Sequence, residues 1–358
     1  MTPPLITVLL PVYNGARHLR EAIDSILSQT FTDFELLIVS DPCSDSSIDI
    51  IKSCADPRMR LVQNPQKLGL VKSLNKGLEL ARGAYIARQD SDDISLSGRL
   101  AAQVGFLEAN PSVVLSGAMG EVIDSTGAKL YLSDWRPLTH SEIKWSLLWA
   151  CQILHSSVMF RKQQIVELGG YSDNCAQAED YHLWSRLALE YPMMQLADVL
   201  VKYRFSEESA CSSNAPEVLS VSLRIARDNM QTLLGHPVPA EVVAAATDFS
   251  SGALDEGGCL PQACELQEEL FQAFKAQGNE ITGWIKADYA ARMRRVVLAY
   301  FGSANARPER LKMLVRGLRP LPGVYAPLGL PRYLLKLLLG PAIVAKIKNT
   351  KAALLCRK

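Results

Sequence analysis

The first 120 residues alternate short apolar runs with segments whose apolar residues recur every three or four positions. The apolar runs predict buried strands at about 5–10, 34–39, 59–62, 84–87 and 113–115. The amphipathic segments predict helices at about 19–27, 45–54, 70–81 and 100–107, with Asp45 as the N-cap of the second. Strands that alternate with helices in this way indicate an α/β fold, a mostly parallel sheet with helices on both faces.

Beyond residue 120 the pattern is mixed and then becomes helical. It predicts a hairpin at 120–132, helices at 137–148 and 179–189, and strands at 158–160 and 194–203. After about residue 215 helices dominate, including 265–275 and 289–300. We therefore expect an α/β domain at 1–215, a helical C-terminal extension at 216–306 and a separate tail at 307–358.

Composition is that of an ordinary globular protein, with 48% hydrophobic and 21% charged residues among 358. The net charge of +1 gives no reason to expect a nucleic-acid partner. The eight cysteines form no CxxC pair, which favours reduced thiols in a cytoplasmic protein. No basic segment precedes the first apolar run, so no export signal is expected, and no stretch approaches the ~20 apolar residues of a spanning helix.

The charge is unevenly distributed along the chain. Residues 307–358 contain 12 Lys/Arg and one acid, Glu309, which leaves 26 basic and 36 acidic residues elsewhere. Within this tail, apolar and basic residues mix at 334–348, a composition that suits an interfacial helix on an anionic membrane. The alternative is a helix packed on the rest of the protein with its lysines in water.

Acidic residues gather directly after the fourth predicted strand, at Asp90, Asp92 and Asp93. Sheets of this class bind ligands at the carboxyl ends of their strands. Three carboxylates in four residues repel one another, and Mg²⁺ or Mn²⁺ would hold them together through oxygen ligands. A solvated acidic turn that caps the next helix is the alternative. No glycine-rich phosphate loop of either common type is present, so a metal is the more plausible holder of a diphosphate.

Six segments in the same order resemble family 2 glycosyltransferases over roughly residues 5–205. They are 8–14 (VLLPVYN), 25–31 (SILSQTF), 34–41 (FELLIVSD), 85–93 (YIARQDSDD), 155–161 (HSSVMFR) and 169–171 (GGY) with 178–181 (AEDY). The resemblance implies the GT-A fold, a Rossmann-like sheet, and inverting transfer of a sugar from a nucleotide diphosphate donor, usually a UDP-sugar.

The resemblance also implies roles for individual residues. Pro11, Tyr13 and Asp41 would line the nucleoside pocket, and Asn14 and Ser91 lie in the same strand-end loops. Asp90 and Asp92 match the Asp-x-Asp that holds the ribose and the metal-bound diphosphate. Asp180 matches the base that takes the acceptor's proton.

Three positions depart from the family pattern. The common Asp-Asp-Gly-Ser is here Ser40-Asp41-Pro42-Cys43, and a frequent Glu is replaced by Ala16. Many members carry a His after Tyr203-Arg204, where this chain has Phe205-Ser206. These changes leave open a weaker metal affinity, or another residue in the role of the missing His.

Other side chains have both a functional and a structural interpretation. Lys72 and Arg88 could approach a phosphate or be solvated. His155 could touch the diphosphate or the acceptor or be structural, and His182 is expected on a helix surface. The tryptophans at 135, 145 and 149 could stack on a sugar, although core packing is favoured.

The predicted function is metal-dependent, inverting transfer from a nucleotide sugar to a glycan or lipid-linked acceptor in cell-surface polysaccharide synthesis. The protein would be cytoplasmic and peripheral on the inner face of the cell membrane. One alternative is a nucleotidyltransferase, although residues 14–17 (NGAR) match its Gly-rich loop poorly. The other is a non-catalytic nucleotide-sugar or glycan-binding protein, against which the acids Asp90, Asp92 and Asp180 argue.

Overall fold

A computed structural model describes residues 3–132, 136, 138–205, 215–247 and 259–302. The chain divides into two compact units, Met1–Ala226 and Arg227–Lys358. The expected division into 1–215, 216–306 and 307–358 stays a prediction, and its last part lies outside the described residues. In the part that the structure describes, no helix combines the length and apolarity needed to cross a membrane.

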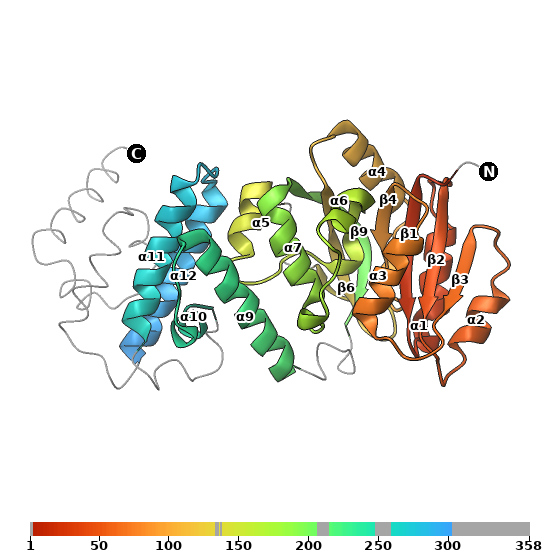
Figure 1. Cartoon of the computed structure of the whole chain (residues 1–358), viewed down its shortest axis with the longest axis horizontal. Coiled ribbons are helices and arrows are strands. Elements are labelled where there is room, and N and C mark those ends of the chain that lie inside the picture. Colours follow the sequence, from red (N-terminus) through yellow and green to blue (C-terminus); the bar gives the residue numbers. More distant parts are fainter. Residues whose placement is uncertain (1–2, 133–135, 137, 206–214, 248–258, 303–358) are drawn as a thin grey trace, which may run out of the picture. The chain divides into compact units, whose positions relative to one another are not determined.

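The first unit is built on a nine-stranded sheet in the order β3-β2-β1-β4-β8-β6-β9-β5, with β7 paired to β6 (Figure 1). Its parallel half consists of β1 (Ile6–Val12), β2 (Phe34–Ser40), β3 (Met59–Gln63) and β4 (Tyr85–Arg88). The mixed half consists of β5 (Ile94–Ser95), β6 (Leu115–Ile123), β7 (Lys129–Leu132), β8 (Met159–Arg161) and β9 (Met193–Arg204). The predicted α/β class and parallel start of the sheet are confirmed.

Helices cover both faces of the sheet because successive strand residues point in opposite directions. Val8 and Leu10 pack in one apolar cluster with α1 (Ala16–Leu27), α2 (Ser47–Ser53) and α4 (Arg99–Ala109). Leu9 points the other way, toward α3 (Leu70–Leu80), where a Cβ on Gly77 would lie only 2.2 Å from its Cδ1. The other helices that lie wholly in this unit are α5 (His140–Ser146), α6 (Lys162–Glu167) and α7 (Glu179–Glu190), with 3₁₀ turns η1 (His155–Ser157) and η2 (Asp173–Cys175).

Several boundaries differ from the sequence prediction. Of the strand expected at 113–115 only Leu115 is in a strand, the much longer β6, which also forms the first arm of the predicted hairpin. The helix expected from Asp45 begins at Ser47, although the Asp45 carboxylate does accept the Ser47 amide at 3.0 Å. The short elements β5 and α6 were not predicted, because two to six residues are too few to show a period.

The second unit is helical. It takes the end of α9 (Ala215–Leu234), then α10 (Ala240–Thr247), α11 (Leu260–Ala276) and α12 (Gly283–Gly302). Phe271 of α11 stacks on Tyr289 of α12 with ring centroids 4.4 Å apart. The helical character predicted after residue 215 is therefore observed in the described ranges 215–247 and 259–302.

Candidate functional site

Asp41 follows β2 and is surrounded by hydrogen-bond donors. Its Oδ1 accepts the Asn64 side chain at 2.8 Å and the Leu68 amide at 3.0 Å, and its Oδ2 accepts the Gly69 amide at 2.8 Å. Burial alone would raise the pKa of Asp41, but these donors, joined by the Ser73 hydroxyl, lower it below its usual value. The carboxylate thus remains charged and holds the loop that leads into α3.

The loop after β1 lies beside Asp41 and the acidic segment. Asn14 has φ = 50°, a left-handed conformation that asparagine tolerates, and its Oδ1 accepts the Ser44 amide at 2.9 Å. A Cβ on Gly15 would lie 2.9 Å from the Ser91 hydroxyl, so glycine allows the two loops to come together. The ring of Tyr13 is 47% exposed, with the ammonium of Lys67 3.9 Å from its centroid.

Pro11 is buried in the central strand β1, a position where proline would normally remove a ladder hydrogen bond. The pairing of β1 with β4 ends at Leu9–Arg88, two residues before Pro11. The missing amide therefore falls beyond the last register pair of the two strands.

The acidic loop after β4 brings three carboxylates together. Asp90, Asp92 and Asp93 offer oxygens that all lie within 4.8 Å of one another. Asp90 forms an ion pair with the buried Arg88 and accepts the Ser156 hydroxyl at 2.6 Å. Burial would raise the pKa of Asp90, but the Arg88 guanidinium lowers it. Arg88 is therefore buried in an ion pair and not solvated, and its approach to a phosphate stays a prediction.

The other two acids of this loop lack such a cation. Burial, followed by the charge of Asp90, raises the pKa of Asp92 to about 6. Burial and the charges of both neighbours raise the pKa of Asp93 well above its usual range. Arg204 donates its backbone amide to Asp93 at 2.7 Å, but its guanidinium pairs with Glu21 instead. Concentrated, under-neutralised oxygen ligands of this kind fit a hard divalent cation.

A buried arginine, Arg99, forms hydrogen bonds with residues on both sides of this loop. The guanidinium of Arg99 donates to the carbonyl oxygens of Arg88 and Val158, and to the side chains of Gln89, Ser95 and Gln103. Burial, reinforced by the charge of Arg88, lowers the pKa of Arg99 to about 9. Arg99 thereby fixes the strand ends on either side of the acidic cluster.

Asp180 lies in the first turn of α7, on the same edge of the sheet. Arg88 and His155 lie within electrostatic reach of both Asp90 and Asp180, so the fold does bring the two predicted acidic sites together. Burial raises the pKa of Asp180, and the preceding carboxylate of Glu179 adds to this effect. Glu179 is itself buried, which raises its pKa to about 7.

The structure resolves most of the open interpretations of other side chains. Lys72 is exposed, with its ammonium 3.8 Å from the Asp173 carboxylate, and its contact with a phosphate stays a prediction. Trp145 and Trp149 are buried and pack edge to face 5.8 Å apart, as the core alternative predicts. His182 is half-buried, so its expected place on the helix surface is only partly correct. Trp135, Ser206 and the basic tail lie outside the described residues.

Asp93, Ser156, Tyr171 and Glu179 were not among the predicted site residues. Ser156, Tyr171 and Glu179 stood inside the segments that carry the resemblance, and Asp93 stood in the acidic cluster itself. Their segments were therefore visible in the sequence. Which member of each segment faces a neighbour was not visible, because that depends on contacts between distant parts of the chain.

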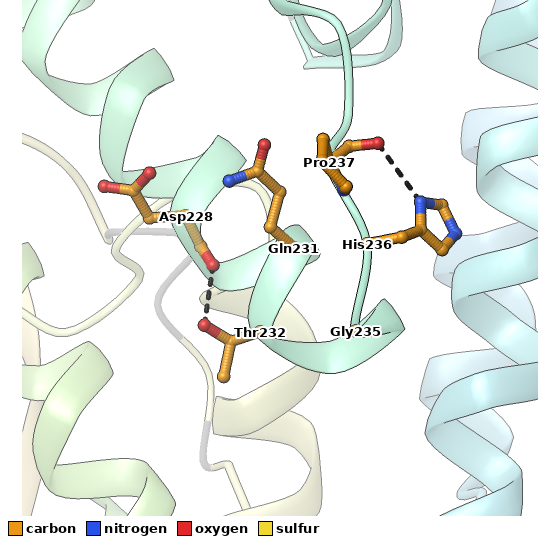
Figure 2. A pocket seen from close by; sticks show the side chains of 6 residues that line it. All are labelled: Asp228, Gln231, Thr232, Gly235, His236 and Pro237. Carbon is orange, nitrogen blue, oxygen red and sulfur yellow. Dashed lines mark hydrogen bonds between the residues drawn. The ribbon is translucent and has the colours of Figure 1, made fainter.

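A hollow in the second unit contrasts with this site. Figure 2 shows its lining by Asp228, Gln231, Thr232, Gly235, His236 and Pro237. The Thr232 hydroxyl donates to the Asp228 carbonyl oxygen, and Gln231 accepts the Val238 amide. His236 lies 2.7 Å from the carboxylate of Glu269. Thr232, Gln231 and His236 thus interact with neighbouring protein groups. In the acidic loop of the first unit, by contrast, burial and the charge of Asp90 raise the pKa values of Asp92 and Asp93.

Comparison with known proteins agrees with this geometry. Residues 7–169 match the family described as Glycosyl transferase family 2. Over 205 residues, 56% of this chain and 76% of the relative, the chain is 33% identical to the amylovoran biosynthesis glycosyltransferase AmsE of Erwinia amylovora. It is 34% identical over 211 residues to an uncharacterized glycosyltransferase of Methanocaldococcus jannaschii, covering 57% of this chain and 72% of that one.

A solved structure supports the fold independently of sequence identity. The crystal structure of S. aureus TarS 1-349 in complex with UDP-GlcNAc superimposes with a TM-score of 0.56 at 16% identity, covering 88% of this chain and 91% of that one. This likeness confirms the predicted GT-A fold. The matching relatives and the family match together show that the chain belongs to glycosyltransferase family 2.

Proposed function

We propose that this glycosyltransferase moves a sugar from a nucleotide diphosphate donor, a UDP-sugar, to an acceptor hydroxyl with inversion at the anomeric carbon. One observation carries the proposal. A carboxylate loop that is short of positive charge and a separate half-buried carboxylate, Asp180, meet at the carboxyl edge of one sheet. Inverting transfer needs these two acidic sites for different tasks.

The donor would lie across the loops after β1, β2 and β4. Tyr13 offers an exposed ring for the base, with Pro11 and Asn14 beside it, and Asp41 orders the facing loop. Lys72 projects from α3 into solvent, where it could reach a phosphate. That TarS was solved with UDP-GlcNAc supports a nucleotide sugar as the donor class.

Asp90 and Asp92 are the proposed holders of the diphosphate through Mg²⁺ or Mn²⁺, with Ser91 between them. When bound, such an ion stabilises negative charge on the departing diphosphate. Arg88 pairs with Asp90, so this carboxylate is held in one orientation and remains ionised. Asp92 lacks such a partner and is the stronger candidate for a direct metal ligand.

Asp180 is the proposed general base. Its carboxylate takes the proton of the acceptor hydroxyl while that oxygen bonds to the anomeric carbon and the bond from this carbon to the diphosphate oxygen breaks. The products are the glycosylated acceptor, with inverted configuration, and the nucleoside diphosphate. The raised pKa of Asp180 makes it a better proton acceptor than an exposed aspartate.

A nucleotide-sugar screen tests the proposed function. Thermal shift with UDP- and GDP-sugars, each with Mn²⁺ or with a chelator, should identify a donor whose stabilisation depends on the metal. Release of nucleoside diphosphate from that donor would then show catalysis. Binding without any turnover would support the non-catalytic alternative, and no binding of any donor would contradict the proposal.

The acceptor is proposed to be a glycan or a lipid-linked glycan of cell-surface polysaccharide synthesis, since a relative is named for amylovoran biosynthesis. The basic tail at 307–358 would hold the protein at the inner face of the membrane. Full-length protein should co-sediment with anionic vesicles at low salt, less so at ~1 M salt, where the Debye length falls to ~3 Å. Deletion of 332–358 should reduce this binding, and absence of binding by the full chain would exclude the membrane role.

A further inference from the structure

Two consecutive residues of the 3₁₀ turn η1 face the two acidic sites. Ser156 donates its hydroxyl to Asp90 at 2.6 Å, on the side of the acidic loop. His155 points to the other site, with its Nδ1 3.5 Å from the Glu179 carboxylate. Glu179 directly precedes Asp180 in the first turn of α7. One short turn thus contacts Asp90 on one side and the residue before Asp180 on the other.

The ring of His155 is held on both sides. Its Nε2 lies 2.9 Å from the Tyr171 hydroxyl, and its ring packs edge to face on Trp184, with centroids 5.9 Å apart. Burial, aided by the charge of Arg88, lowers the pKa of His155 to about 3, so the ring is neutral. Both ring nitrogens thus lie against protein groups, which favours the structural interpretation of His155.

Tyr171 is in turn hydrogen-bonded to Asn75 of helix α3. Its amide donates to Asn75 Oδ1 at 2.9 Å, and its carbonyl oxygen accepts from Asn75 Nδ2 at 2.8 Å. Gly170 permits this approach: its φ is +67°, and a Cβ there would lie 2.5 Å from Asn75 Oδ1. Contacts therefore run from α3 through Tyr171 and His155 to the start of α7.

We propose that His155 is a positioning residue, which orients the first turn of α7 through Glu179 and so directs the Asp180 carboxylate at the acceptor hydroxyl. This inference rests on the proposed function and goes beyond it by assigning what aligns the base. Reacting groups must be aligned closely, and a misplacement of ~1 Å can lower a rate ~10²-fold.

The test removes one contact of the ring and leaves the packing in place. Tyr171→Phe keeps the aromatic ring but deletes the hydroxyl 2.9 Å from His155. We expect kcat to fall between about 10-fold and 10²-fold, with donor KM and UDP binding unchanged. In an Asp180→Asn background the same change should lower the residual rate less than about 2-fold, since groups that act as a unit are not additive.

Tyr85→Phe is the matched control. Tyr85 begins β4, at the opposite end of the strand from the acidic loop, and its buried hydroxyl contacts Glu108 and Arg161. This variant should lower the melting temperature without changing kcat. If Tyr171→Phe does not fold, Glu179→Gln supplies the same comparison from the other side of the ring.

Two results would overturn the inference. One is an unchanged kcat in Tyr171→Phe, and the other is an equal fold-loss in the native and Asp180→Asn backgrounds. Either result leaves the proposed function intact, provided that the native protein transfers sugar. A native protein that turns over no nucleotide sugar would instead refute the proposed function itself.

Discussion

Asp41 and Asp92 follow two parallel strands of the same sheet, yet the fold treats their carboxylates in opposite ways. Asp41 accepts hydrogen bonds from two backbone amides and from Asn64, and its pKa is lowered. Among the described residues, the Asp92 carboxylate finds only its own backbone amide as a donor, and its pKa is raised to about 6. The fold thus surrounds the Asp41 carboxylate with hydrogen-bond donors and provides few for the Asp92 carboxylate.

The difference separates structural acids from chemically available ones. A carboxylate that the fold saturates stabilises a loop and has little capacity left for a ligand. A carboxylate that is buried without compensation destabilises the protein until a proton, a cation or a substrate group compensates it. Substitutions at saturated acids should therefore lower stability, whereas those at uncompensated acids should lower activity.

Asp180 should show the largest effect on activity. Asp180→Asn preserves size but removes the ability to accept a proton, so the transfer rate should fall ~10²–10⁴-fold. The melting temperature should be unchanged or higher, because a partly buried charge is removed. Steady-state kinetics with a thermal melt measure both, and full transfer activity in a folded variant would refute the base assignment.

Glu179 should make stability depend on pH. Its folded pKa of about 7 exceeds the ordinary 4.5, so the folded state binds the proton more tightly than the unfolded state. The contribution of Glu179 to stability is then present below about pH 4.5 and is lost as pH rises to about 7. The loss is on the order of 3 kcal/mol. Chemical denaturation across this range should show a smaller decline in Glu179→Gln, and identical curves would contradict the assignment.

Asp92 should control the response to metal. UDP with Mn²⁺ at ~100 times its dissociation constant should stabilise the native protein by about 2.7 kcal/mol. Asp92→Asn should lose the part of this stabilisation that a chelator removes, while the melting temperature without ligand stays the same or rises. An unchanged metal-dependent shift in the variant would show that Asp92 does not bind the ion.

Asp41→Asn is the matched change at the saturated acid and should have the smallest effect. Asparagine retains one oxygen, so the amides of Leu68 and Gly69 cannot both keep their acceptor. Each buried donor left unpaired costs about 1–3 kcal/mol, and the free energy of unfolding should fall by about this amount. Denaturant melts without ligand measure it, and a variant as stable as the native protein would remove the contrast with Asp92.

The sequence was informative wherever the relevant pattern is local. The alternation of strands and helices appears in spans of 4 to 12 residues, so β1 to β4 and their helices were predicted close to their observed bounds. Asp90 and Asp92 stood out because like charges close in sequence need compensation. The length of β6 was underestimated and the two-residue β5 was not predicted. Both strands are defined by their pairing with β9 more than by their own residues.

The sequence by itself determined the fold class, the family and the position of the acidic loop, since periodicity and short motifs are properties of neighbouring residues. Only the tertiary structure decided which acids are compensated. Among the described residues, Arg88 forms its ion pair with Asp90, and Arg204 turns its guanidinium to Glu21, 183 residues away in the chain. The pKa of a carboxylate depends on burial and on the charges a few ångströms away, and chain folding alone sets both.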